Sequence, residues 1–182
     1  MIALVGLGSN VGDRAGAVGS AADRLRSYAS ADTFRMSHLY ETRPWGVADQ
    51  PDFVNAVCQF DTSFHAIPLL EALKEIERLL GRTETTRWGP RRLDLDLLDL
   101  GGETRSDPEI TLPHPRIAER AFVLVPLCEI APRWRDPLTG RTATEMLALL
   151  DPDPGEVRLA GSIPLKEEKI VAGGPRSHIS ND

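Results

Sequence analysis

The stretch Leu93-Asp94-Leu95-Asp96-Leu97 alternates apolar and acidic residues, which is typical of a β-strand with one buried side and one polar side. Side chains alternate along a strand, so the pattern predicts three leucines in the core and both carboxylates on the opposite side, about 6.6 Å apart along the backbone. Carboxylates on one side repel each other unless a cation lies between them. Mg²⁺ is commonly held by one or two carboxylates plus substrate phosphates. The alternative is a plain solvent-facing strand side, although Asp is a poor strand former.

Just upstream of this strand lies a basic segment with a single opposing acid: Arg82, Arg87, Arg91, Arg92 and Glu84. Arginines beside paired carboxylates are typical of a site that binds a polyphosphate through a metal ion. The carboxylates hold the metal ion, and the guanidinium groups neutralise the remaining negative charge of the phosphates. The stretch 83–86 and Gly89-Pro90 predict a lid. A solvated loop is the alternative for the arginines taken alone.

The remaining patterns indicate an α+β domain. We expect strands at Ile2–Leu7, Thr33–Thr42 and Phe53–Thr62, helices at Asp13–Tyr28, Ile67–Leu80 and Glu145–Leu150, and a buried helix or strand at Phe122–Ile130. The order β-α-β-β-α-β places helices on a largely antiparallel sheet. We expect a single domain over residues 1–164 and a disordered polar tail over 165–182.

Two further groups carry chemistry. Phe53 and Asn55 share the strand face opposite the apolar one, which suits a flat heterocycle, with Phe122 or Trp88 as a second ring. His114 stands between two prolines and could contact phosphate, although an ordinary loop is a fair competitor.

No Walker-type phosphate loop is present, so phosphate contacts must come from side chains. Gly6-x-Gly8-x-x-x-Gly12 has the wrong spacing for a dinucleotide fingerprint and is interpreted as a tight strand-to-helix turn.

Composition bounds the function. The 182 residues carry a net charge of −6, which argues against a general nucleic-acid binder. Eighteen of the 21 basic residues are Arg, which codon bias explains for the most part. Cys58 and Cys128 form neither a disulfide scaffold nor a cysteine zinc site, which fits a reducing cytoplasm. We expect no membrane span and no signal peptide.

The motifs together resemble one family. They are Leu7-Gly-Ser-Asn10, Tyr40-Glu-Thr42, Gln50-Pro-Asp-Phe-Val-Asn55, Ile76-Glu77, Gly81-Arg82, Arg87-Trp-Gly-Pro-Arg91, Leu93-Asp-Leu-Asp96, Pro113-His114, Arg120-Ala-Phe122 and Pro126-Leu127. In this order the chain resembles the 6-hydroxymethyl-7,8-dihydropterin pyrophosphokinases of folate biosynthesis. The resemblance implies a ferredoxin-like α+β fold and transfer of a diphosphoryl group from ATP to the pterin's hydroxymethyl group, giving AMP.

The resemblance also implies roles for particular residues. Catalytic residues would be Arg82, Arg91, Asp94 and Asp96, with a pair of Mg²⁺ ions on Asp94 and Asp96. ATP would be bound by Lys74, Glu77, Arg82, Trp88, Arg91, Thr111, His114 and Arg120. The pterin would be bound by Thr42, Arg43, Trp45, Gly46, Phe53, Asn55 and Phe122. ATP and the pterin would be the partners of a monomer that binds neither nucleic acid nor membrane.

Two rival functions remain. One is a non-catalytic ferredoxin-like nucleotide- or RNA-binding domain, which the acidic charge and the lack of an RNA-binding aromatic motif oppose. The other is a dinucleotide oxidoreductase, which the glycine spacing opposes.

Overall fold

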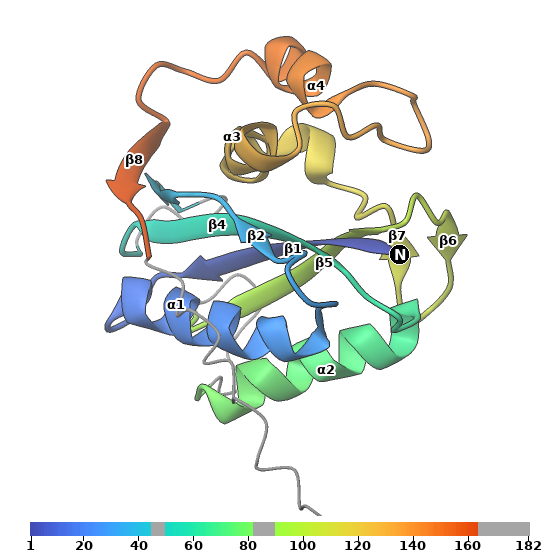
Figure 1. The fold of residues 1–182 in the computed structure, drawn as a ribbon. Helices are drawn as coiled ribbons and strands as arrows, with labels where there is room; N and C mark the ends of the chain where they lie inside the picture. The colour runs from blue at the N-terminus through green and yellow to red at the C-terminus, as the bar shows by residue number, and fades with distance from the viewer. Residues whose placement is uncertain (45–49, 82–89, 164–182) are drawn as a thin grey trace, which may run out of the picture.

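A computed structural model of the protein describes residues 1–44, 50–81 and 90–163. At its centre lies an antiparallel sheet in which the strands follow the order β5-β1-β4-β3-β8, and β2 also pairs with β4 (Figure 1). The strands are β1 (Ile2–Ser9), β2 (Arg35–Met36), β3 (Leu39–Thr42), β4 (Phe53–Asp61), β5 (Asp94–Leu100) and β8 (Val157–Gly161). A separate small hairpin joins β6 (Arg105–Ser106) to β7 (Thr111–Leu112).

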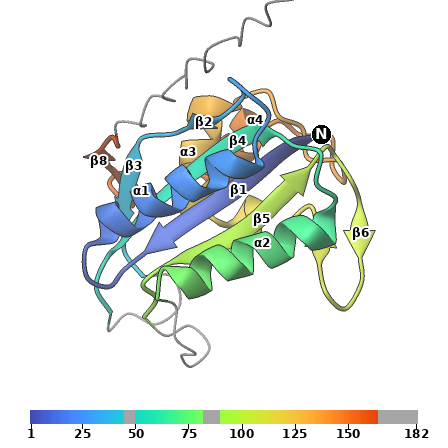
Figure 2. The same ribbon diagram turned by 60° about the horizontal axis from the view of Figure 1, so that its bottom comes forward.

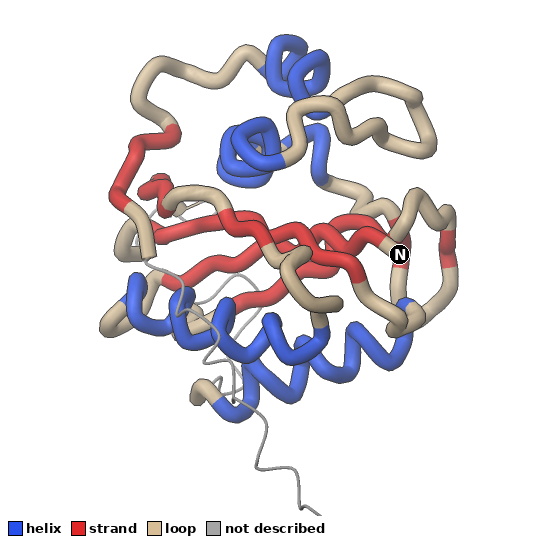
Figure 3. Tube along the Cα trace, viewed as in Figure 1, coloured by secondary structure: helices blue, strands red, loops and turns tan. Residues whose placement is uncertain are grey.

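Helices cover both faces of the sheet. Helices α1 (Arg14–Leu25) and α2 (Ala66–Leu79) lie side by side on one face; α3 (Ala121–Ile130) packs on the other face, and α4 (Ala143–Leu150) packs on α3 (Figures 1 and 2). Short 3₁₀ turns follow α1 at Arg26–Tyr28 and precede α3 at Ile117–Glu119. The tube view separates the three layers, with the strands between two helical layers (Figure 3).

The two sides of the sheet have separate cores. Leu95 and Leu97 of β5 and Cys58 and Phe60 of β4 pack toward α1 and α2, while Val57 packs toward α3 and α4. The expected burial of the leucines at 93, 95 and 97 is therefore confirmed, with exposures of 0%, 6% and 4%. The other face of β4, which carries Phe53 and Asn55, is partly buried as well because α3 packs on it.

The element boundaries show where the sequence patterns were incomplete. Gly6 and Gly8 lie inside strand β1, so their interpretation as a turn is wrong. Pairing with β4 on one side and β5 on the other holds both glycines extended. The turn comes later, at Gly12, whose φ of +70° favours glycine. The segment 33–42 forms two short strands rather than one, and Phe122–Ile130 resolves as a helix.

Strand β8 was not expected. Four of its five residues are exposed, so the segment has no apolar alternation to signal a strand. The predicted tail 165–182 lies outside the described residues, and the single-domain boundary at residue 164 stays a prediction. None of the helices in the described part of the chain is long and apolar enough to span a membrane.

Candidate active site

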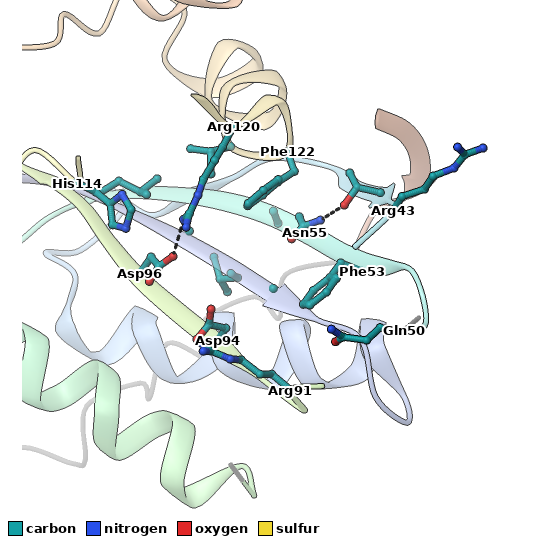
Figure 4. Close-up of a pocket in the computed structure, with 17 residues that line it drawn as sticks. Arg43, Gln50, Phe53, Asn55, Arg91, Asp94, Asp96, His114, Arg120 and Phe122 are labelled. Carbon is teal, nitrogen blue, oxygen red and sulfur yellow. Dashed lines mark hydrogen bonds and ion pairs between the residues drawn. The ribbon is translucent and has the colours of Figure 1, made fainter. Parts of the chain in front are cut away.

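A cavity of about 300 Å³ opens on the α3 side of the sheet, where β1, β4 and β5 meet the start of α3. Its volume is in the range of small-molecule sites. Ten of its lining residues are labelled in Figure 4: Arg43, Gln50, Phe53, Asn55, Arg91, Asp94, Asp96, His114, Arg120 and Phe122. Residues from widely separated parts of the sequence therefore meet at one place.

The two carboxylates of β5 share the cavity face, as the alternation predicted. Asp94 pairs with Arg91, and Asp96 pairs with Arg120 at 3.3 Å (Figure 4). The Asp94 and Asp96 side chains keep 27% and 39% of their surface exposed, so both remain reachable from the cavity. Each acid thus has an arginine beside it that could instead neutralise a bound phosphate.

The paired carboxylates also fit a divalent ion. Mg²⁺ usually takes one or two carboxylates and completes its shell with water and phosphate oxygens. Asp94 and Asp96 supply such a pair on a rigid strand. Among the described residues, no three His, Cys, Asp or Glu side chains gather closely enough to form a complete protein-built metal site. A pair of carboxylates leaves coordination positions of such an ion for phosphate oxygens.

Arg91 is held in place by Asn10, which the sequence motifs included but assigned no role. The backbone N–H of Arg91 donates to Oδ1 of Asn10 at 2.7 Å, and the backbone N–H of Asn10 donates to the carbonyl of Arg91 at 3.0 Å. Nδ2 of Asn10 also donates to Oε1 of Gln50 and to the carbonyl of Pro51. Asn10 is only 1% exposed, so it ties the segment before β5 to the segment before β4.

His114 faces the same cavity. Burial lowers its pKa from the ordinary 6.5, and the charges of Arg120 and Arg116 lower it further, against the opposing effect of Asp96. The backbone N–H of Arg116 donates to Nδ1 at 3.2 Å, which assigns the ring proton to Nε2. His114 can therefore donate one hydrogen bond to an anion in the cavity.

The opposite side of the cavity carries two aromatic rings and a side-chain amide. Phe53 projects into it from β4 and Phe122 from α3 (Figure 4). Asn55 lies between β1 and β3, where its Nδ2 donates to Oγ1 of Thr42 at 2.8 Å. The guanidinium carbon of Arg120 lies 5.4 Å from the centre of the Phe122 ring. This side could hold a flat ring system and present an amide oxygen to it.

Several expected ATP contacts lie elsewhere. Lys74 is exposed on α2, Thr111 is exposed on β7, and neither lines the cavity. Glu77 is 3% exposed beneath β5 and accepts the backbone N–H of Leu95 at 2.7 Å. Arg43 lines the cavity, but its guanidinium points away from Asp94 (Figure 4).

Four expected site residues lie outside the described ranges: Arg82 and Trp88 for ATP, and Trp45 and Gly46 for the pterin.

Four charged residues next to Thr42 and Phe53 form a cluster that no local sequence pattern predicts. Arg14 pairs with Glu41 at 2.9 Å, and Arg158 of β8 pairs with Asp52 at 3.0 Å and with Glu41 at 3.3 Å. The Arg14 hydrogen bond is the main reason that the pKa of Glu41 is below its ordinary 4.5. The cluster joins the residues next to Thr42 and Phe53 to α1 and β8.

Comparison with known proteins identifies the chain. The family model described as 7,8-dihydro-6-hydroxymethylpterin-pyrophosphokinase (HPPK) matches residues 4–132, which include every described residue of the cavity. The chain belongs to this family. Its β-α-β-β-α-β sheet with helices is the ferredoxin-like α+β fold of the family, and its reaction is that of a pyrophosphokinase of folate biosynthesis with ATP as co-substrate.

Curated relatives agree with this membership. A protein of Methylorubrum extorquens is 45% identical over 150 residues, covering 82% of this chain and 94% of that one. One of Pseudomonas aeruginosa is 41% identical over 158 residues, covering 87% and 96%. Both are called 2-amino-4-hydroxy-6-hydroxymethyldihydropteridine pyrophosphokinase. Nothing among these relatives favours a non-catalytic binding domain.

Solved structures show the same fold at low identity. The Plasmodium falciparum HPPK-DHPS structure with pteroate has a TM-score of 0.65 and 14% identity over 81% of this chain. The present chain spans only 44% of that longer chain, so the likeness concerns one part of it and carries the fold alone.

Proposed function

We propose that the cavity of Figure 4 is the active site in which the enzyme transfers the diphosphoryl group of MgATP to the hydroxymethyl oxygen of 6-hydroxymethyl-7,8-dihydropterin. One observation carries the proposal. Asp94 and Asp96 lie on one side of the cavity and Phe53 and Asn55 on the other, with only β1 between them. Two strand spacings separate Asp94 from Asn55, about 9.5 Å, so phosphates and pterin would lie side by side.

The pterin would lie on the aromatic side. Its flat ring would stack between Phe53 and Phe122, and Asn55 would bind its polar edge while Thr42 fixes the amide. The hydroxymethyl group would then extend toward β5. Arg43, Trp45 and Gly46 belong to this proposed subsite through the family resemblance.

The triphosphate would lie along β5. Arg91 and Arg120 would donate some of their N–H groups to phosphate oxygens instead of to the two carboxylates. His114 would donate a hydrogen bond from Nε2–H to another phosphate oxygen. Asp94 and Asp96 would hold a pair of Mg²⁺ ions, which would draw charge from the phosphates and lower the pKa of the acceptor hydroxyl. Arg82 and Trp88 complete the proposed ATP contacts through the family resemblance, whereas Lys74, Glu77 and Thr111 do not line the cavity.

The residues would then act by positioning and by charge. The hydroxymethyl oxygen forms a bond to the β-phosphorus of ATP, and the bond from that phosphorus to the α,β-bridging oxygen breaks. AMP leaves with the electron pair, and the hydroxyl proton passes to water or a carboxylate. Arg91 and Arg120 would neutralise the charge that moves onto the transferred group and the leaving oxygen. We further propose that the enzyme works as a monomer in the cytoplasm.

Exchange of one carboxylate tests the assignment. Asp96→Ala should lower kcat on the order of a hundredfold or more, because the site loses a metal ligand, while its melting temperature stays near that of the wild type. Asp61→Asn at the far end of β4 is the matched control and should leave turnover unchanged. Near-normal turnover by Asp96→Ala would refute the assignment of this cavity.

A further inference from the structure

Gly8 lies where β1 separates the two sides of the cavity. It is opposite Asn55 of β4 and opposite Asp94 of β5 in the antiparallel register. Side chains of directly opposed residues project to the same side of a sheet. A side chain at position 8 would therefore stand in the cavity, between the carboxylate and the amide, and glycine leaves that place open.

The first atom of such a side chain would already be crowded. A Cβ on Gly8 would lie 3.1 Å from Oδ1 of Asn55 and 3.8 Å from Cδ1 of Phe53. A Cβ on Gly6, two residues earlier on the same face, would meet only Leu98, at the ordinary contact distance of 3.6 Å. The crowding is thus specific to position 8 and to one atom of Asn55.

Neither partner can move aside at low cost. Asn55 is 5% exposed, and its Nδ2 is held by Oγ1 of Thr42 at 2.8 Å. Strand β1 is paired on both sides at Gly8, so its backbone is fixed as well. A methyl group at position 8 would therefore cover Oδ1 of Asn55 from the cavity side.

We propose that Gly8 is a specificity-determining residue for the acceptor: its missing side chain keeps Oδ1 of Asn55 open to an N–H donor on the pterin edge. Nδ2 already donates to Thr42, and Oδ1 is the acceptor that this amide would offer to an N–H group of the ring. The site then selects heterocycles with an N–H edge over rings of equal size that carry only acceptors there. This inference rests on the proposed function, since it takes the pterin as the occupant.

Direct binding tests the proposal. The variants Gly8→Ala and Gly6→Ala are titrated with 6-hydroxymethylpterin and, separately, with a magnesium-bound non-hydrolysable ATP analogue. Gly8→Ala should weaken pterin binding about tenfold or more, the loss expected for one buried hydrogen bond, and should leave analogue binding within about twofold. Gly6→Ala should weaken pterin binding less than Gly8→Ala. Equal pterin affinity for Gly8→Ala and wild type would overturn the proposal.

A double-mutant cycle identifies the atom through which the methyl group acts. With Asn55→Ala as background, Gly8→Ala should lose most of its effect on pterin binding, because the covered oxygen is gone. An effect of equal size in both backgrounds would contradict a role through Asn55.

If Gly8→Ala does not fold, a comparison of two ligands on proteins that keep Gly8 tests the inference instead. Wild type should bind 6-hydroxymethylpterin at least about tenfold more tightly than its 2,4-dimethoxy analogue, which has no N–H donor on the pyrimidine ring, and Asn55→Ala should lose this preference. Wild type binding both rings equally would refute the inference. A wild type that produces no AMP would instead refute the proposed function, so the two failures differ.

Discussion

Glu77 offers a sharp test of how β5 is held. Among the strands that the structure describes, β5 is at the edge of the sheet, and on its outer side the carboxylate of Glu77 accepts the backbone N–H of Leu95 at 2.7 Å. Leu95 is the residue between Asp94 and Asp96. We predict that Glu77→Ala destabilises the fold and lowers kcat, because the buried N–H loses its acceptor and the two carboxylates lose part of their support.

The magnitude follows from burial. Glu77 is 3% exposed, so water cannot replace the lost hydrogen bond without a rearrangement. A hydrogen bond to a charged group contributes about 1.5–3 kcal/mol when its partner is left buried. In a domain of this size 1 kcal/mol shifts the melting temperature by roughly 2–4 °C, so the fall should be about 3–12 °C.

Thermal melting and steady-state kinetics separate this role from nucleotide binding. Glu77→Gln is the matched control, since its amide oxygen can still accept from Leu95 and should retain most of the stability. For Glu77→Ala we expect a lower kcat with KM for ATP within about twofold of wild type. An unchanged melting temperature together with a raised KM for ATP would refute the structural role and favour direct contact with ATP.

Three further changes have defined outcomes. Burial raises the pKa of Asp99 above its ordinary 3.8. Ionisation of this carboxyl group therefore lowers the stability of the folded state as the pH rises above 3.8. Asp99→Asn keeps an acceptor for Trp134 Nε1, so its melting temperature at neutral pH should equal or exceed that of wild type. Any increase in melting temperature should vanish below pH 3.8, where the carboxyl group of wild type is protonated. A lower melting temperature at neutral pH would contradict this. Arg158→Ala should raise KM for the pterin by about two- to threefold, because exposed ion pairs contribute little. The increase should be smaller at high salt, which screens these charges. A larger change in KM for ATP than in KM for the pterin would contradict this prediction. Phe122→Ala should raise KM for the pterin about tenfold, in keeping with a lost aromatic stacking contact, and an unchanged value would exclude stacking there.

Strong local periodicity made much of the fold predictable. The alternation of Leu and Asp in β5 correctly assigned one side to the core and the other to the cavity. Helix α2 lies at Ala66–Leu79, one residue from its predicted position, because its leucines recur at helical spacing. Strand β8 was missed since an exposed edge strand needs no apolar alternation.

The site was only partly predictable because its geometry depends on sheet register. Phe53, Asn55 and the two acids could be grouped by strand face, and the structure brings them into one cavity. Sequence spacing could not show that Gly8 lies beside Asn55, because that contact joins two strands 47 positions apart. The same holds for Glu77, whose buried hydrogen bond to β5 has no local signal.

The products of one reaction test the central claim most directly. The enzyme is incubated with MgATP and 6-hydroxymethyl-7,8-dihydropterin, and the nucleotides and pterins are separated and followed by ³¹P NMR. The account predicts AMP and the pterin diphosphate in equal amounts, with Asp96→Ala forming neither at a comparable rate. Formation of ADP with a pterin monophosphate, or no pterin-dependent use of ATP, would contradict it.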